Sequence, residues 1–182
     1  MKLIDAAIRL SSRDLTGHVN CSHLTQLELQ VASGVAKRPK PWDPSLEALW
    51  ERGMRHESEF IQVLSDQGLD LVAIEGVDID DVAFESTLAA MRAGVDVIVQ
   101  AALRDGDWVG RADVLRRVEA PSNLGSWSYE VYDTKLSRDT KANTILQLCL
   151  YSEMLAQMQG RTPEHMHVVA PWTEFVPQSY RL

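Results

Sequence analysis

One stretch of the sequence, residues 127–151, combines acidic, basic and amide side chains at spacings that could support chemistry. Its first part is typical of a β-strand and contains Asp133 and Lys135. Because side chains alternate between the two faces of a strand, these two residues project from the same face. The second part is typical of a helix, with Gln147 and Tyr151 one turn apart on one side. The stretch therefore predicts a polar cluster where a strand and a helix meet.

Asp113 supplies a second carboxylate on the preceding strand, behind Gly110, which would let a backbone come close. Two carboxylates near the middle of neighbouring antiparallel strands repel each other and are costly to bury. A hard divalent cation such as Mg²⁺ prefers carboxylate oxygens and would remove this repulsion. Lys135 would then lie beside a metal-bound water, where it could orient that water or offset charge on a phosphate.

His56 falls on the apolar stripe of a helix expected over residues 45–67. A lone histidine in such a place is usually a core residue that is satisfied by a hydrogen bond. Gly53, one turn earlier, leaves room for another group to approach and favours a ligand role instead. An imidazole among carboxylates shifts the metal preference toward Mn²⁺ while accepting Mg²⁺. The imidazole is predicted to converge with the carboxylates of Asp113 and Asp133 within the reach of one metal ion.

Simpler interpretations of these polar residues stay open. An Asp-x-Lys pair is common on strands, and Asp133 and Lys135 alone are explained by a surface ion pair worth at most about 1 kcal/mol. His165 and His167 could share a metal, but their alternation with apolar residues favours an ordinary exposed strand face. Glu57 is adequately explained by a solvated helix face.

Basic and aromatic side chains that could contact nucleic acid are few. The best placed basic groups are the patch at residues 37–40 and the pair Arg138 and Lys141. Tryptophan rings could stack on bases, although isolated tryptophans are more often packing residues. The residues concerned are Trp42, Trp108 and Trp172.

The rest of the chain supplies the elements that must position these groups. Helices are expected over residues 12–34 (with a break near 17–20), 45–67, 82–93 and 140–159. Strands are expected over residues 69–74, 95–103, 108–118, 126–136, 165–170 and 174–180. The stripe from Leu46 to Leu64 is expected to be buried, and the alternation of residues 95–103 predicts a strand with one buried face. The order predicts an α/β protein with a central mixed β-sheet flanked by helices.

The composition is that of an ordinary globular domain: 182 residues, 45% hydrophobic and 24% charged. No apolar run approaches the roughly 18 residues of a membrane span, and no signal peptide is recognisable. The formal net charge of −8 counts against a broad electrostatic grip on nucleic acid. Two cysteines, Cys21 and Cys149, fit neither a disulfide framework nor a metal cluster, so a reduced, cytoplasmic setting is expected.

Four motifs in order resemble the RecB-type nucleases of the PD-(D/E)xK superfamily. They are Gly53…His56-Glu, Gly110-Arg-Ala-Asp113, Asp133-Thr-Lys135 and Gln147-Leu-Cys-Leu-Tyr151. The Gln-x-x-x-Tyr element separates this branch from the wider superfamily, and the resemblance runs from about residue 15 to residue 180. It implies a restriction-endonuclease-like fold and metal-dependent hydrolysis of phosphodiester bonds by an activated water, in DNA rather than RNA.

The resemblance also implies roles for individual residues. The metal-contacting positions are His56, Asp113, Asp133 and Thr134. The two aspartates act in catalysis with Lys135, which assists the attacking water. Gln147 and Tyr151 support the site or contact the nucleic acid. The implied cofactor is Mg²⁺ or Mn²⁺, and no iron–sulfur cluster is expected because the four cysteines that some relatives use are missing.

The expected partner is DNA, as single strands or ends, with no membrane contact. Relatives often occur as one module of a helicase–nuclease, so a fused or associated helicase or second nuclease-type domain is a further expected partner. Residues 1–182 are expected to form one domain, either complete or as the N-terminal part of a longer multidomain protein. Ala112 departs from the proline of the superfamily name. The rival interpretation is a catalytically inactive scaffold or nucleic-acid-binding module that retains the fold.

Overall fold

The computed structural model describes residues 1–182 except 5–6, 40–42 and 77. A six-stranded mixed sheet forms its centre, in the order β3-β4-β5-β6-β7-β8. Its strands are β3 (Leu71–Ala73), β4 (Val97–Asp105), β5 (Trp108–Val118), β6 (Ser128–Thr134), β7 (His165–Val169) and β8 (Gln178–Arg181). β3 runs parallel to β4 and β6 runs parallel to β7, whereas the other neighbours are antiparallel. The predicted α/β class with a mixed sheet is confirmed.

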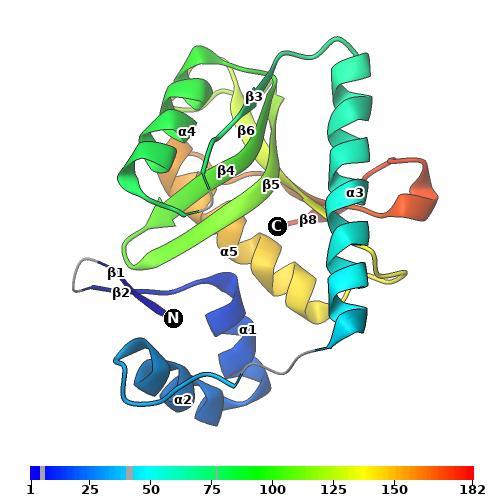
Figure 1. The fold of residues 1–182 in the computed structure, drawn as a ribbon. Coiled ribbons are helices and arrows are strands. Elements are labelled where there is room, and N and C mark those ends of the chain that lie inside the picture. The colour runs from blue at the N-terminus through cyan, green and yellow to red at the C-terminus, as the bar shows by residue number, and fades with distance from the viewer. Residues whose placement is uncertain (5–6, 40–42, 77) are drawn as a thin grey trace.

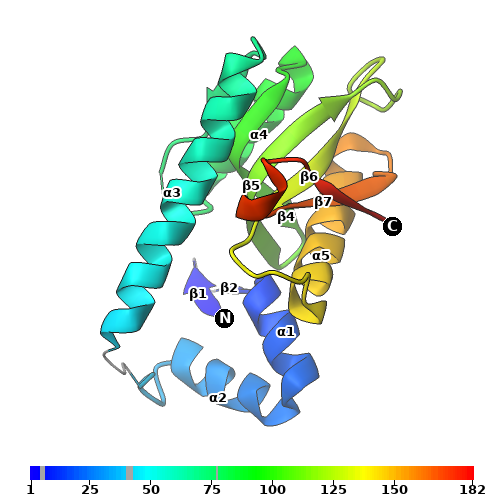
Figure 2. The same cartoon turned by 90° about the vertical axis from the view of Figure 1, so that its right-hand side faces the viewer.

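Helices cover both faces of this sheet. The helices of the described residues are α1 (Ser12–Asn20), α2 (Ser22–Ala32), α3 (Pro44–Asp66), α4 (Asp81–Ala93) and α5 (Ala142–Gln159), with a short 3₁₀ helix, η1 (Pro171–Thr173). α4 and α5 pack on one face, and α3 crosses the other (Figures 1 and 2). Among the described residues, no helix is long and apolar enough to span a bilayer.

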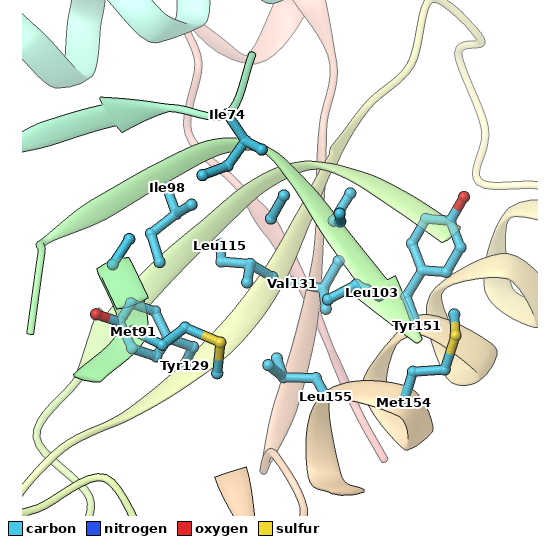
Figure 3. Packing of buried hydrophobic residues seen from close by; sticks show 14 of the residues in the cluster. Ile74, Met91, Ile98, Leu103, Leu115, Tyr129, Val131, Tyr151, Met154 and Leu155 are labelled. Atoms are coloured by element: carbon cyan, nitrogen blue, oxygen red, sulfur yellow. The ribbon is translucent and has the colours of Figure 1, made fainter. Parts of the chain in front are cut away.

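Two hydrophobic clusters hold the layers together. The larger one joins the sheet to α4 and α5, with Leu103, Leu115 and Val131 of the strands meeting Met91 and Leu155 of the helices (Figure 3). In the smaller cluster, α3 packs on the opposite face of the sheet. β4 is therefore covered on both faces, and the prediction that this strand buries only one face is wrong.

The pairing of β4 with β5 is interrupted at Gln100 and Asp113, which lie opposite each other in the register. Gln100 has a φ of 53°, in the left-handed region that side chains other than glycine rarely adopt. On one side of the interruption Val114 packs in the α3 cluster, whereas Ala112 on the other side belongs to the α4–α5 cluster. Positions two residues apart therefore face opposite clusters across the interruption. The two polar side chains at the interruption, Gln100 and Asp113, belong to neither apolar cluster.

The apolar stripe of α3 is buried only in its second half. Phe60 and Leu64 are inaccessible to solvent, but Leu46, Leu49 and Trp50 are 56%, 51% and 66% exposed. The first half of the helix extends beyond the sheet (Figure 2), so helical periodicity alone overestimated the buried length.

Other differences from the predicted elements are local. A hairpin of β1 (Lys2–Ile4) and β2 (Ala7–Arg9) was not predicted, because strands of three residues are too short to show a period. The last strand begins at Gln178 instead of residue 174, because Glu174 and Phe175 both have a positive φ and form a turn. The expected break in the first helix is confirmed, at Cys21 between α1 and α2.

A buried polar network fastens β8 to the sheet. The Nε2 atom of His167 lies 2.8 Å from Oε2 of Glu130, and its Nδ1 atom lies 2.9 Å from the Ser179 hydroxyl. His167 is 7% exposed and its ring stacks on Tyr132, so the exposed strand face expected for this histidine is wrong. Burial acts to raise the pKa of Glu130, but hydrogen bonds from His167 and the His165 amide outweigh it and hold the pKa below its ordinary value.

We expect Glu130→Gln to lower the free energy of unfolding by about 1–3 kcal/mol at pH 7, because it weakens charge-assisted hydrogen bonds to buried donors. Since the folded-state pKa of Glu130 is lowered, its contribution is present above the unfolded-state pKa and is lost as the pH falls through the folded-state value. Urea denaturation should show a deficit that shrinks below about pH 4. The exposed Glu85→Gln is the matched control. A deficit equal at both pH values would contradict this account.

Candidate functional site

The two aspartates meet where β5 and β6 stop pairing. The last pair of the ladder, Val114 with Tyr132, places Asp113 directly opposite Asp133. The Oδ2 atom of Asp113 accepts hydrogen bonds from the backbone N–H and the hydroxyl of Thr134, both at 2.8 Å. Asp133 is 1% exposed. The register thus brings together the two carboxylates that the sequence pattern singled out, one of them fully buried.

Lys135 and Gln147 contact the buried carboxylate from two sides. The Lys135 ammonium lies 2.5 Å from Oδ2 of Asp133, and the Gln147 side-chain amide donates to Oδ1 at 3.1 Å. Oδ2 of Asp133 is thus held in an ion pair with Lys135, and Oδ1 accepts from Gln147. A cation that binds Asp133 would share Oδ2 with the ammonium or displace it.

The pKa values of Asp133 and Lys135 differ from the ordinary values of these side chains. Burial, reinforced by repulsion from Asp113, raises the pKa of Asp133 to about 7 even though Lys135 opposes the shift. Burial acts to lower the pKa of Lys135, but attraction to the two aspartates outweighs it and raises this pKa above its ordinary value. The lysine is therefore charged at neutral pH, while the buried carboxyl is poised between its two protonation states. Perturbed pKa values in one cluster are typical of functional sites.

Glu57 is a third carboxylate that the sequence analysis assigned to a solvated helix face. Burial and repulsion from Asp113 raise the pKa of Glu57, and the Gln100 side-chain amide donates to its Oε1 atom. Two signals could have found these residues. Glu57 follows a histidine on the buried stripe, so it lies at the edge of that stripe. Gln100 is the polar residue within the otherwise apolar run 97–103 of β4.

His56 lies apart from this cluster. Its Nε2 atom is 2.9 Å from the Val169 carbonyl oxygen, its ring stacks on Phe175, and it is 3% exposed. The predicted convergence with Asp113 and Asp133 is not met, because among the described residues no three His, Cys, Asp or Glu side chains stand close enough to hold one ion. The hydrogen-bonded core histidine, the simpler alternative, describes its position. Its Nδ1 atom is buried and has no hydrogen-bond partner among the described residues.

Tyr151 closes the site toward α1. Its hydroxyl lies 3.4 Å from the Ser12 hydroxyl, and burial together with the charges of Asp133 and Asp113 raises its pKa. The ring packs against Gly110, where an added Cβ would come within 2.5 Å of a ring carbon (Figure 3 shows the ring). The glycine therefore admits an aromatic ring, not the backbone that the sequence suggested.

The donor set fits a hard divalent cation better than a softer metal. Asp113 and Asp133 offer carboxylate oxygens, and the charge of Glu57 acts on the same cluster. Mg²⁺ usually keeps several waters and needs only one or two protein carboxylates. Thr134 already donates to Asp113 through its hydroxyl. Within the ranges that the structure describes, no three His, Cys, Asp or Glu side chains stand close enough together to hold one ion.

The remaining sequence candidates lie away from the cluster or outside the described residues. Lys40 and Trp42 belong to the segment that is not described. Arg138 and Lys141 are exposed in the connection before α5. Trp108 packs against the core instead of offering a free face to a base.

Replacing Asp133 with asparagine tests the charge state of the site. Between the ordinary carboxyl pKa and about 7, the folded protein binds more protons at Asp133 than the unfolded chain does, so this residue makes the wild type less stable as the pH rises. We expect Asp133→Asn to match the wild type near pH 4. At pH 8 without metal it should be more stable by about 2–4 kcal/mol in urea denaturation.

The matched control is Asp139→Asn, which removes the same charge from an exposed residue. This variant should leave the pH dependence of stability unchanged. If Asp133→Asn were less stable than the wild type at pH 8, the raised pKa of Asp133 would be wrong.

Two glycines on the motif positions should respond oppositely to alanine. We expect Gly110→Ala to lower the free energy of unfolding by about 1–3 kcal/mol, because the new methyl group overlaps Tyr151. Gly53→Ala is the control: within α3 its Cβ would meet no described atom within 4 Å, and a better helix former should gain about 0.5–1 kcal/mol. Thermal unfolding measures both. A Gly110→Ala protein as stable as the wild type would show that the ring is not held there.

Comparisons with known proteins add no relative from which roles could be transferred. No family model matches the sequence, and no curated protein matches it. The interpretation of the cluster therefore rests on its own geometry and on the motifs.

Proposed function

We propose that this domain is a divalent-metal-dependent nuclease of the RecB type, with a restriction-endonuclease-like fold, that hydrolyses phosphodiester bonds of DNA. One observation carries the proposal. Asp113 and Asp133 face each other across β5 and β6, with the Lys135 ammonium 2.5 Å from Oδ2 of the buried Asp133. An arrangement of two carboxylates and one cation is costly to bury unless a ligand uses it.

The order of elements supports the fold assignment. The antiparallel strands β4, β5 and β6 lead into α5, and the chain returns as β7 parallel to β6. The two aspartates lie on β5 and β6, and Lys135 follows directly after β6. Three of the four motifs thus lie on adjoining strands and on α5 beside them, whereas the motif with His56 lies on α3 at the other face of the sheet.

In the proposed reaction a water oxygen attacks phosphorus, the bond to the leaving oxygen breaks, and that oxygen takes up a proton. A bound Mg²⁺ or Mn²⁺ would supply Lewis-acid polarisation and a more acidic water. Asp113 and Asp133 would hold it, and Gln147 fixes the orientation of Asp133 through Oδ1. The Lys135 ammonium can orient the water or offset charge that develops on the phosphate.

The rival function, a catalytically inactive module, also has an observation in its favour. Thr134 and Lys135 already contact the two aspartates, so the carboxylates are partly compensated within the chain. The net charge of −8 also disfavours strong binding of nucleic acid.

Cleavage of labelled single- and double-stranded DNA decides between the two functions. We expect cleavage with Mn²⁺ or Mg²⁺ and none with EDTA. Lys135→Ala and Asp133→Ala should each lower the rate by about 100-fold or more, the loss typical of removing a group that stabilises developing charge. Arg92→Ala, which removes an exposed basic side chain of α4, is the control and should cleave like the wild type.

A labelled RNA of the same sequence tests the substrate preference and should be cleaved more slowly. A folded wild-type protein that cleaves no strand with either metal would refute the nuclease and favour the inactive module. Equal activity in wild type and both variants would show that cleavage comes from another site or from a contaminant.

A further inference from the structure

A cavity of about 590 Å³ lies next to the carboxylate cluster, between the N-terminal hairpin, α1 and the first residues of β5. Its wall includes five basic side chains: Lys2, Arg9, Arg13, Arg38 and Arg111. Among the described residues, two acidic ones, Asp14 and Asp78, line it. The whole chain has 26 acidic and 18 basic residues, so the cavity reverses the overall balance of charge.

Much of this positive charge is not neutralised by carboxylates. The Arg111 guanidinium donates to the backbone carbonyls of Gln100, Asp78 and Ile74, at 2.9, 2.9 and 3.3 Å, and its buried Nε atom has no described partner. Arg13 is exposed and forms no ion pair within the part of the chain that the structure describes.

The acidic residues of the wall are themselves occupied. Asp14 accepts hydrogen bonds from the backbone N–H and the hydroxyl of Ser11, at 2.8 and 2.7 Å, as part of the α1 cap. Asp78 lies 3.8 Å from the Lys2 ammonium, and both side chains are largely exposed, so this ion pair is weak. Arg38 pairs with Glu28 and Arg9 reaches Asp107 at 3.5 Å. Lys2 and Arg13 thus retain most of the capacity to bind an anion, whereas Arg111 adds its positive charge while both of its terminal nitrogens donate to backbone carbonyls.

Tyr151 joins this cavity to the carboxylate cluster. It lines the cavity together with Ser12, and it lies close enough to Asp133 and Asp113 for their charges to act on its hydroxyl. A group in the cavity would therefore be separated from the aspartates by one aromatic ring.

An adjoining cavity of about 770 Å³ shares Lys2, Arg9 and Asp78 with the first one. It adds Arg104 but also Asp80 and Asp81, so its acidic and basic side chains are equal in number. The excess of positive charge is confined to the side next to Tyr151. A nucleic-acid strand that continued from the first cavity into the second would therefore find no excess of positive charge there for its further phosphates.

We propose that the cavity beside Tyr151 binds a phosphomonoester at the end of a nucleic-acid strand. This inference rests on the proposed nuclease function and adds its substrate class, strands with a terminal phosphate. A terminal phosphate carries about −1.5 to −2 charges at neutral pH, more than the single charge of a phosphodiester, and suits the excess of basic side chains. Arginine is also the side chain best suited to paired hydrogen bonds with phosphate. The volume is that of a small-ligand site, with room for a terminal nucleotide but not for a duplex.

Binding measured without turnover tests this inference. Fluorescence anisotropy in EDTA compares one short single-stranded DNA with a 5′-phosphate, a 3′-phosphate or hydroxyls at both ends. We expect one of the phosphorylated strands to bind about tenfold more tightly than the hydroxyl form, the ratio that one additional charge-assisted hydrogen bond provides.

The double variant Lys2→Gln, Arg13→Gln removes two side chains that make no hydrogen bond to a described backbone group, so it should fold. It should reduce the preference to less than about threefold. The control Arg92→Gln, Arg181→Gln removes two exposed charges outside both cavities and should keep it. Equal binding of all three strands by the wild type, or an intact preference in the first double variant, would overturn the inference.

Competition identifies the source of the phosphate. Inorganic phosphate and a mononucleotide should displace the strand only at much higher concentration than an unlabelled phosphorylated strand. Displacement at equal concentration would make the occupant a free phosphomonoester and overturn the strand-end assignment. The nuclease proposal fails separately: a preference for phosphorylated ends without cleavage under any metal retains this inference and refutes the nuclease, and cleavage without an end preference does the reverse.

Discussion

Repulsion between Asp113 and Asp133 is the constraint around which this end of the sheet is built. The β5–β6 register places the two carboxylates opposite each other, and the second is almost fully buried. Every polar contact nearby reduces that cost: Thr134 donates twice to Asp113, Gln147 donates to Asp133, and the Lys135 ammonium lies beside both charges. The compensation is incomplete, because burial and the second aspartate still raise the pKa of Asp133 to about 7. A cation that binds there would stabilise the folded state by mass action.

The neighbouring strand is strained at the same level of the sheet. Gln100 lies opposite Asp113, has a positive φ, and uses its amide to hold Glu57. A residue in this conformation costs of order 1–3 kcal/mol and persists only where its surroundings hold it. Here the sheet on either side remains well packed, since Val99 and Ala101 continue the two apolar clusters. The backbone strain at Gln100 therefore occurs where Glu57, the third carboxylate, is held near the aspartates. It does not reflect a poorly packed core.

The features that were predicted correctly depend on the periodicity of apolar residues along the chain. The features that were missed depend on how the elements pack against one another. The α/β class, the strand meander and the placement of Asp113 opposite Asp133 follow from alternation along strands whose lengths and turns are clear in the sequence. The positions of His56 and Glu57 do not, because neighbours on a helix differ by about 100° and only the packing of α3 decides which one meets the sheet edge. The exposure of Leu46 and Trp50 was missed for the same reason, since periodicity does not show where the sheet beneath a helix ends.

Although the chain as a whole is acidic, its basic side chains are not evenly distributed over the surface. A net charge of −8 weakens non-specific attraction to any polyanion, yet Lys2, Arg13 and Arg111 line one cavity whose wall also contains Tyr151. Tyr151 is in turn held by Gly110 and lies within reach of the Asp113 and Asp133 charges. Within the described part of the chain, the cavity beside Tyr151 would therefore attract an anion next to the carboxylates that hold a cation in the proposed function. Under that proposal, the two charges favour a ligand that carries one phosphate into the cavity and a second phosphate to the proposed metal. A strand end has both, whereas a single free phosphate has one.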